Sequence, residues 1–580
     1  MLGVMGMRRL LLVFAIVGCG SDPANAPDAG ADATPPDAYV DLSGPVFEPN
    51  HIVDVAITMA PADWDTLRGE TRTLGSIIEG ACLAMPRPSP FSTFTASITV
   101  DGTSFPMVGV HKKGFLGSLD PVKPSLKVKF DEYVAGQEYL GLEKLTLNNS
   151  HQDPSYVRQC LAYQAFAVAG VVTPRCNFAH VRVNGTDLGI YVNVEPIDHK
   201  LTKKRFADGT GQLYEGSLSD FRTNWVNTFD PKGAGDQSDL VAVATVLETA
   251  SDANLVASLE PYLDVDRFIT YWAMEMLTNH WDGYANDKNN FFVYHDPTSG
   301  KLQFIPWGVD ATFQPNATFG NIGSTTGPIA IAASGMLANR LFTNPATKQM
   351  IFDRQRALLA SSWSEPTMLA EIDRMEALIG PIVDSVSGTT WHGAVTQVRN
   401  FVNGRRAKLT TALDAGPTWT DPVAGYPCVD VTARVEGTFT TKYGTLGTTN
   451  PLGTGSGTFS ITIGGVTTVL APVGATAGND PNAPVGAPRS AIQVFGRRAA
   501  DGHILVVSIG MPPSRLFPRA VTLGFFDANG GVYDYDPGTN TTTQVGFLLG
   551  DMTLTAAAPT ANADVVGSFA ANADVPGSPP

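Results

Sequence analysis

With 580 residues, the chain is longer than one hydrophobic core usually supports, so its length predicts two folded domains joined by linkers. Hydrophobic residues make up 43% of the chain, which is typical of soluble globular proteins. The 55 acidic side chains against 39 Lys and Arg give a formal net charge of −16. This balance argues against a general nucleic-acid binder, which would carry a basic footprint, but it is compatible with a local basic pocket for phosphate groups.

Residues 1–19 are typical of a lipoprotein signal peptide. Arg8 and Arg9 precede an apolar run from Leu10 to Val17, and Ile16-Val17-Gly18-Cys19 resembles a lipobox. The alternatives are a plain secretory signal or a short membrane span, and the run is shorter than the ~20 residues that a span needs. We therefore expect lipid attachment at Cys19 and export to the bacterial cell envelope, at the periplasmic or surface face of the outer membrane.

Composition divides the rest of the chain into segments. We expect a disordered Ala/Pro/Asp tether at 20–46, a folded main domain at 47–415, a Pro/Gly linker at 416–427, an all-β module at 428–556, and a disordered tail at 557–580. Within the module, alternating residues on both sides of Gly464-Gly465 predict a hairpin, as in a small β-sandwich or barrel.

Four cysteines follow the signal segment: Cys82, Cys160, Cys176 and Cys428. Their spacing fits no compact metal-ligand motif, so a zinc site is not expected. In an exported protein they can form one or two disulfides, or remain as buried thiols, and the sequence alone does not pair them.

The most informative segment begins with a helical pattern. Apolar residues recur along one helix face from Val265 to Leu277 and stop at the polar loop 279–283. A buried run at 291–294, turn residues at 296–300 and a second apolar run at 302–307 then predict an antiparallel hairpin.

This hairpin places Asn290 and Asp310 together at its open end, and Asp282 lies on the loop that leads into it. Carboxylate and amide oxygens suit a hard cation such as Mg²⁺. Each residue taken singly is better explained as a partner for loop backbone, and Asn286, Asp287 and Asn289 compete with Asn290 as ligands. A Ca²⁺-stabilised loop at 282–290 is an alternative, although its spacing does not follow the EF-hand pattern.

A second candidate lies on the alternating run 125–130. Ser125 and Lys127 share one face of this predicted strand, so Lys127 can enter a cleft and contact phosphates. A lysine on a strand more often simply faces solvent.

Taken together, these motifs resemble the spore-coat protein H (CotH) family of atypical protein kinases. The resemblance covers about residues 50–413 and rests on Lys123-Pro124-Ser125 to Phe130, Leu147-Asn148-Asn149, Asp153 to Arg158, Val183-Asn184-Gly185, Gly189 to Glu195, Gln212 to Glu215, and Ile305 to Asp310. It implies an α+β fold, in which an atypical protein-kinase-like two-lobed domain precedes a small all-β, sandwich-like domain.

The resemblance also implies roles for particular residues. Asp282 would be the catalytic Asp, Asp310 and Asn290 the metal ligands, Lys127 the phosphate-binding lysine, and Arg158 and Glu195 further nucleotide contacts. The helix predicted from Asp153 to Ala169 would be the counterpart of kinase helix αC. The implied cofactors are ATP and Mg²⁺ or Mn²⁺, and the implied partner is a protein with a Ser or Thr acceptor, with membrane contact through the lipid only and no nucleic acid.

The chain departs from kinase patterns at three places. The predicted αC-like helix contains no Glu to pair with the lysine, Gly308 stands where the family usually has Asp, and only Val108–Gly117 could replace a Gly-rich phosphate loop. A catalytically silent surface protein, acting as an adhesin or structural binding module, is therefore the alternative to an ATP- and Mg²⁺-dependent kinase.

Overall fold

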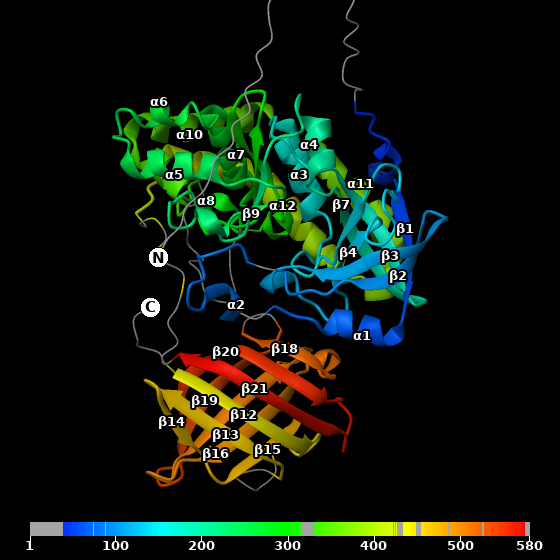
Figure 1. Ribbon diagram of the computed structural model, residues 1–580, viewed down its shortest axis with the longest axis vertical. Coiled ribbons are helices and arrows are strands. Elements are labelled where there is room, and N and C mark those ends of the chain that lie inside the picture. The colour runs from blue at the N-terminus through cyan, green and yellow to red at the C-terminus, as the bar shows by residue number, and fades with distance from the viewer. Residues whose placement is uncertain are drawn as a thin grey trace, which may run out of the picture. The chain divides into compact units, whose positions relative to one another are not determined.

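The computed structural model describes residues 39–72, 75–87, 89–314, 330–420, 423, 425, 428, 433–447, 454–484, 486–524 and 527–574. Within these ranges the protein is α+β, as predicted, and a mixed main domain precedes an all-β module (Figure 1). The predicted signal peptide, its lipidation at Cys19 and most of the tether lie outside the described residues. The predicted tether ends too late, because Ser43 and Val46 are already buried in the folded domain.

The first lobe is a closed barrel with the strand order β1-β2-β3-β4-β5-β7-β6. Its strands are β1 Ile52–Met59, β2 Phe94–Val100, β3 Thr103–Lys113, β4 Ser125–Lys129, β5 Lys144–Asn148, β6 Cys176–Val183 and β7 Thr186–Val194. Alternate apolar residues such as Val53, Val55 and Ile57 fill the interior, as a period of two requires. Lys127 therefore points away from this core, because its neighbours Leu126 and Val128 belong to it.

The helices and short 3₁₀ turns of the first lobe connect or cover its strands. They are η1 Gly44–Phe47, α1 Pro61–Gly69, α2 Gly75–Ile78, η2 Leu116–Ser118, α3 Arg158–Val168 and α4 His199–Arg205. Helix α3 begins five residues later than the sequence predicted, because the Asp153 side chain folds the preceding segment into a turn and accepts the backbone N–H of Arg158 at 2.9 Å.

The second lobe combines a small sheet, in the order β11-β10-β8-β9, with helices. Its elements are β8 Leu213–Gly216, η3 Val226–Thr228, β9 Asp230–Pro231, α5 Ser238–Thr249, α6 Leu255–Leu259, α7 Val265–Thr278, α8 Tyr284–Asp287, β10 Phe291–Asp296, β11 Lys301–Pro306, η4 Val309–Ala311, α9 Met336–Thr343, α10 Pro345–Ser361, α11 Glu365–Ser387 and α12 Trp391–Asp414. Their apolar core also takes in α3 and the outward-facing residues Phe178 and Val192 of the barrel. Two separate cores thus make the main domain two-lobed.

The C-terminal module is one curled sheet rather than two stacked sheets. Its elements are β12 Ala433–Lys442, β13 Ser456–Ile463, β14 Val466–Val469, β15 Val473–Asn479, β16 Ser490–Arg497, β17 Ile504–Met511, η5 Pro513–Arg515, β18 Arg519–Leu523, β19 Asn529–Asp536, β20 Thr541–Ala556 and β21 Asp564–Asp574. The predicted hairpin around Gly464-Gly465 is confirmed, since β13 pairs with β14. A bridge between Tyr443 and Ala477 joins the regions of β12 and β15, so the sheet folds back around a single core.

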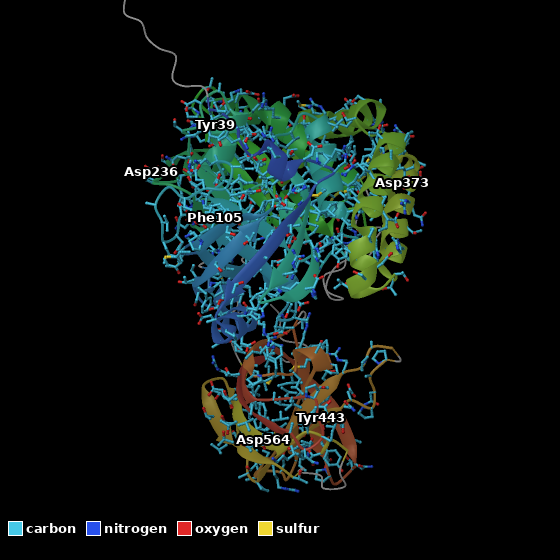
Figure 2. All side chains as sticks on the ribbon, turned by 90° about the vertical axis from the view of Figure 1, so that its right-hand side faces the viewer. Tyr39, Phe105, Asp236, Asp373, Tyr443 and Asp564 are labelled. Atoms are coloured by element: carbon cyan, nitrogen blue, oxygen red, sulfur yellow. A yellow bond between two sulfur atoms is a disulfide. The ribbon has the colours of Figure 1, made fainter. Side chains whose placement is uncertain are left out.

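The prediction of a disordered tail from residue 557 is wrong for residues up to 574. Strand β21 pairs with β12 on one side and β20 on the other, and Phe569 belongs to the module's core. The Ala- and Asp-rich composition hid this strand, because small side chains alternate there with few large apolar ones. Figure 2 shows the side chains of the protein as sticks, with Phe105 labelled on the barrel and Tyr443 and Asp564 on the module.

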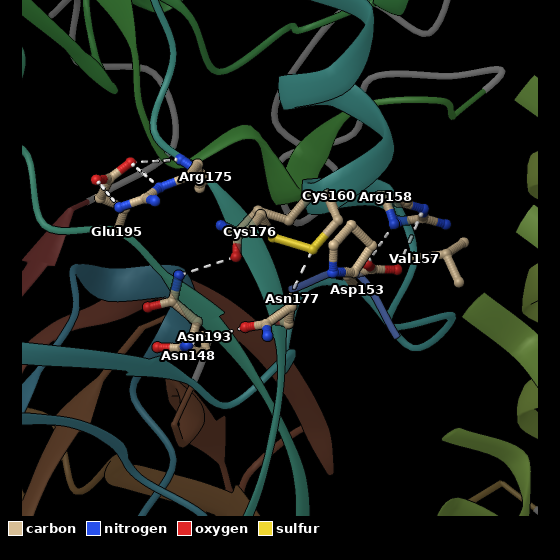
Figure 3. Close-up of a disulfide and its surroundings, with 12 residues drawn as sticks. Asn148, Asp153, Val157, Arg158, Cys160, Arg175, Cys176, Asn177, Asn193 and Glu195 are labelled. Carbon is tan, nitrogen blue, oxygen red and sulfur yellow. Dashed lines mark hydrogen bonds and ion pairs between the residues drawn. A yellow bond between two sulfur atoms is a disulfide. The ribbon is translucent and has the colours of Figure 1, made fainter. Parts of the chain in front are cut away.

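The structure pairs all four cysteines that follow the signal segment. Cys82 bonds to Cys428 and so ties a loop of the main domain to the start of the module. Cys160 on α3 bonds to Cys176 on β6, which fixes the helix to the barrel wall (Figure 3). Within the described residues, no helix is both long enough and apolar enough to cross a membrane.

Replacing Cys160 and Cys176 together with Ser should lower the free energy of unfolding of the main domain by about 3 kcal/mol, because the 16-residue loop they close regains entropy in the unfolded chain. Urea denaturation followed by tryptophan fluorescence measures the difference. It should vanish when the wild type and the variant are both reduced with dithiothreitol. A difference that persists under reduction would show that the cysteines contribute through packing instead.

Candidate functional site

The predicted hairpin forms the framework of the site. Strands β10 and β11 pair in the register Phe291 with Pro306 and Asp296 with Lys301, so the turn lies at 297–300. At the open end, Gly308 has a φ of +53°, and a Cβ there would stand 2.5 Å from Asn290 Oδ1. The structure thus explains why this chain has Gly at 308: the position needs positive φ and the space belongs to Asn290.

Asp282 is the centre of a hydrogen-bonded loop. Asn290 donates its Nδ2 to Asp282 Oδ2 at 2.7 Å, and Asn289 donates to Oδ1 at 3.1 Å. Burial raises the pKa of Asp282 well above its usual value, and the charges of Asp287 and Asp310 raise it further. The predicted convergence of Asp282, Asn290 and Asp310 is therefore present in the structure, and Asn289 and Asp287 join it.

A buried carboxyl holds this loop in place. Glu275 on α7 is fully buried, and its two oxygens accept the backbone N–H groups of Tyr284 and Ala285 at 2.8 and 3.0 Å. These are the first residues of α8, directly after the Asp282-Gly283 turn. Burial raises the pKa of Glu275 to about 7, because the carboxyl gains too little from these bonds to offset its lost hydration.

Asp310 on η4 faces a lysine, but this lysine is Lys113 at the end of β3. Burial raises the pKa of Asp310 to about 6, Asp153 adds to the increase, and Lys113 and Arg158 oppose it. Burial in turn lowers the pKa of Lys113 to about 8, helped by Lys127 and opposed by Asp310. The two lobes thus place a cation and a carboxylate opposite each other.

A chain of side-chain amides connects Lys113 to helix α3. Lys113 Nζ donates to Asn148 Oδ1, and Asn148 Nδ2 donates to Gln159 Oε1 at 2.9 Å. Lys113 Nζ also lies 5.4 Å from the centre of the Trp307 ring. Lys113 is thus connected to α3 through neutral amides, and α3 itself contains no Glu.

Lys127 lies near Lys113 but farther from Asp310. Strand pairing places Lys113 opposite Ser125 and His111 opposite Lys127, so both lysines share the outer barrel face. Burial lowers the pKa of Lys127, the charge of Lys144 lowers it to a smaller extent, and the charge of Glu215 raises it. The two lysines therefore form a partly buried cationic group on the barrel.

The two remaining predicted site residues, Arg158 and Glu195, have different surroundings. Arg158 acts on Asp310 through its charge, but its backbone N–H and its guanidinium both engage Asp153. Glu195 lies outside this group: its carboxylate pairs with Arg175 at 2.7 Å (Figure 3) and with Lys204 at 2.5 Å. Glu195 therefore joins the end of β7 to the segment before β6, and its carboxylate is already fully engaged.

The donors around Asp282 are of the kind that a hard divalent cation takes. Asp287 and Asp310 both raise the pKa of Asp282, and Asn289 and Asn290 add amide oxygens, as Mg²⁺ prefers. A second acidic group, Glu143, Asp198 and His199, could geometrically hold an ion. Its charges are already compensated, since Lys144 lies 3.3 Å from Asp198 and Lys200 lies 3.4 Å from Glu143.

Sequence reasoning missed Lys113, Asn148 and Gln159. A signal for Lys113 was present: it lies inside the 108–117 segment that was considered as a phosphate loop. Asn148 stands in the Leu147-Asn148-Asn149 motif, but the motif gave it no role. The role of Asn148 and Gln159 comes from the contact between β5 and α3.

A model of the family described as "CotH kinase protein" matches residues 110–409, slightly more than half of the chain. The inner spore coat protein H of Bacillus subtilis is 25% identical over 188 residues, which cover 30% of this chain and 51% of that protein. Spore coat protein homolog 1 of Rhizopus delemar is 24% identical over 327 residues, which cover 53% of this chain and 51% of that protein. Invasin CotH3 of the same fungus is 27% identical over 210 residues, which cover 33% of this chain and 35% of that protein.

The chain spans about half the length of the first two of these relatives. Among solved structures, the Helicobacter pylori proinflammatory kinase CtkA is 12% identical, with a TM-score of 0.28 over 53% of this chain and 94% of that one. At that score the likeness carries no argument about this protein, and the site rests on its own geometry.

Glu275→Gln should change how stability depends on pH. The pKa of the Glu275 carboxyl has the ordinary value of 4.5 in the unfolded chain and about 7 in the folded protein. Its stabilising contribution is therefore complete below pH 4.5 and is lost as pH rises through 7. Between pH 5 and 8, the wild type should lose about 2 to 3 kcal/mol relative to the variant in urea denaturation. The exposed control Glu48→Gln should follow the wild type, and a constant difference for Glu275→Gln would contradict a buried neutral carboxyl.

Proposed function

Because the chain belongs to the CotH kinase protein family, we propose that its main domain is an ATP- and Mg²⁺-dependent kinase that phosphorylates Ser or Thr of a protein. The observation that carries this proposal is the opposition of Lys113 on the barrel, with Lys127 near it, to Asp310 on the second lobe, whose charge also acts on Asp282. Each group of like charges is partly or fully buried, so each needs a counter-charge. A nucleotide triphosphate with a divalent cation supplies both.

Each residue then has a defined task. Lys113 and Lys127 bind the phosphates, and Asp310 with the Asn290 amide oxygen holds the cation, which when bound neutralises charge on the transferring phosphoryl group. The acceptor hydroxyl attacks the γ-phosphorus, the bond to the β–γ bridging oxygen breaks, and ADP leaves. Asp282 takes the hydroxyl proton as the general base.

We also propose that the chain works outside the cytoplasm. The Cys82–Cys428 and Cys160–Cys176 bonds fit an oxidising compartment, and relatives bear the names spore coat protein and invasin. Lipid attachment at Cys19 would hold the protein at the cell envelope. The same names support the alternative of a catalytically silent surface protein. A wild-type protein that binds nucleotide but transfers no phosphate would favour this alternative.

Asp310→Asn and Asp282→Asn should separate binding from transfer. Loss of a metal ligand should weaken Mg²⁺-dependent nucleotide binding about 100-fold in Asp310→Asn. Asp282→Asn should bind nucleotide nearly as the wild type does but transfer phosphate about 10²- to 10⁴-fold more slowly, because the proton acceptor is lost. Calorimetric titration with ADP and Mg²⁺ measures the first effect, and labelled γ-phosphate transfer to the chain and to Ser/Thr peptides measures the second.

The matched control for both is Asp353→Asn, an exposed position on α10 that should behave as the wild type. Nucleotide affinity that is unaffected by Asp310→Asn, or that does not depend on Mg²⁺ or Mn²⁺, would overturn the metal assignment.

Nucleotide affinity should depend on pH with two limbs. Asp310, with a pKa of about 6, must lose its proton to bind the cation, so affinity should fall about tenfold between pH 7 and pH 5. Lys113, with a pKa of about 8, loses its charge above that pH, so affinity should fall again on the alkaline side. Lys113→Arg should keep binding at pH 9, since arginine stays charged. A flat profile from pH 5 to 9 would contradict both roles.

A further inference from the structure

Within the described residues, Arg72 and Arg87 both carry buried N–H groups that have no acceptor, although Arg87 as a whole is only half-buried. Arg72 is only 6% exposed, and its Nε has no partner. Arg87 donates its Nη1 to the carbonyls of Ser217 at 2.8 Å and Leu218 at 3.3 Å, whereas its Nε and Nη2 have no partner. Buried donors of this kind are rare, because each loses its hydration without compensation.

The two guanidinium groups also repel each other. Burial and, to a smaller extent, the charge of Arg72 together lower the pKa of Arg87 to about 10. Burial lowers the pKa of Arg72 as well, opposed only by Glu215. Two like charges in one buried place, with unfilled donors, form a site for an oxyanion, because the planar fork of arginine matches carboxylate and phosphate groups.

The pair lies beside the proposed catalytic site but is distinct from it. The Arg72 guanidinium lies 5.2 Å from the centre of the Phe115 ring, two residues beyond Lys113. Arg87 holds the carbonyls of 217 and 218, and the next residue, Ser219, donates its N–H to Lys288 O at 2.8 Å in the catalytic loop region. The charges that act on Lys113 are those of Lys127, Asp310 and Glu215, not those of the arginines.

The C-terminal module fixes the segment that carries the arginines. Thr522 Oγ1 on β18 donates to Arg72 O at 2.8 Å and lies 2.6 Å from the Thr71 hydroxyl. The Cys82–Cys428 bond holds the same segment between Arg72 and Arg87. Both arginines precede residue 110, where the family match begins, so they belong to a part of this chain outside the shared kinase region.

We propose that Arg72 and Arg87 bind an anionic side chain of the acceptor protein, next to the Ser or Thr that receives the phosphate. The anion is a carboxylate or a phosphoserine, which share the oxyanion chemistry that the paired guanidinium groups fit. The acceptor is a better source than the nucleotide, since Lys113 and Lys127 already face the phosphate position. This inference rests on the proposed function for its meaning, but the binding it describes is measurable without catalysis.

The test uses the full chain and fluorescein-labelled peptides that contain one Ser flanked by Asp, by Asn or by phosphoserine. Fluorescence polarisation should show at least about tenfold tighter binding of the Asp or phosphoserine peptide than of the Asn peptide, as a charge-assisted pair warrants. In Arg87→Gln and in Arg72→Gln this preference should fall to within about twofold, while Arg87→Lys should keep part of it. Arg356→Gln, on the far helix α10, should keep all of it.

The arms of the experiment distinguish the sources of the anion. Tighter binding of the Asp peptide identifies a carboxylate, and tighter binding of the phosphoserine peptide identifies a phosphate already added. Equal affinity for all three peptides overturns the inference. So does a loss of Mg²⁺-ADP affinity in Arg87→Gln with peptide preference unchanged, because the anion is then the nucleotide. Peptide preference without any phosphate transfer would leave the anion site standing and reject the kinase proposal. Thermal unfolding of each variant verifies that it is folded.

Discussion

The electrostatic attraction between Lys113 and Asp310 is the interaction on which the site depends. The lysine comes from the barrel and the carboxylate from the turn after the hairpin, so each lobe alone would hold a buried, uncompensated charge. Burial raises the pKa of Asp310 to about 6 and lowers that of Lys113 to about 8, which means that each charge is only partly stabilised by the other. The remaining cost is large enough to favour a ligand that carries both signs.

The position of α3 affects this attraction, because the helix is connected to Lys113 by hydrogen bonds. Gln159 accepts a hydrogen bond from Asn148, and Asn148 accepts one from Lys113, so a shift of the helix alters the position of the lysine that faces Asp310. In a kinase with a Lys–Glu pair, the two charges attract each other over several ångströms. An amide relay acts only at hydrogen-bond distance, so it needs a helix that does not move. The Cys160–Cys176 bond and the buried contact between α3 and the second-lobe core provide that rigidity.

The sequence predicted the parts of the site that one local pattern controls. The hairpin register followed from two apolar runs and a turn, and with it the meeting of Asp282, Asn290 and Asp310. The choice between Lys113 and Lys127 did not follow, because it depends on which end of the barrel face meets the second lobe. Residue Glu195 shows the same limit: its place at the end of β7 was predictable, but its pairing with Arg175 and Lys204 depends on segments distant in the sequence. Strand β21 was missed because its stability comes from two neighbouring strands rather than from its own composition.

The C-terminal module contributes to the site by holding the segment that carries Arg72 and Arg87. A loop that carries two poorly hydrated cations is costly to order, and the buried side chains of Ile77 and Leu83 between Arg72 and Arg87 offset only part of that cost. The bonds from Thr522 and the disulfide to Cys428 supply the missing restraint from outside the loop. A rigid loop keeps the donors of the arginines apart from other acceptors and available to a ligand. Release of this restraint would let the guanidinium groups turn to solvent, and the oxyanion site would be lost while the Lys113–Asp310 contact remained.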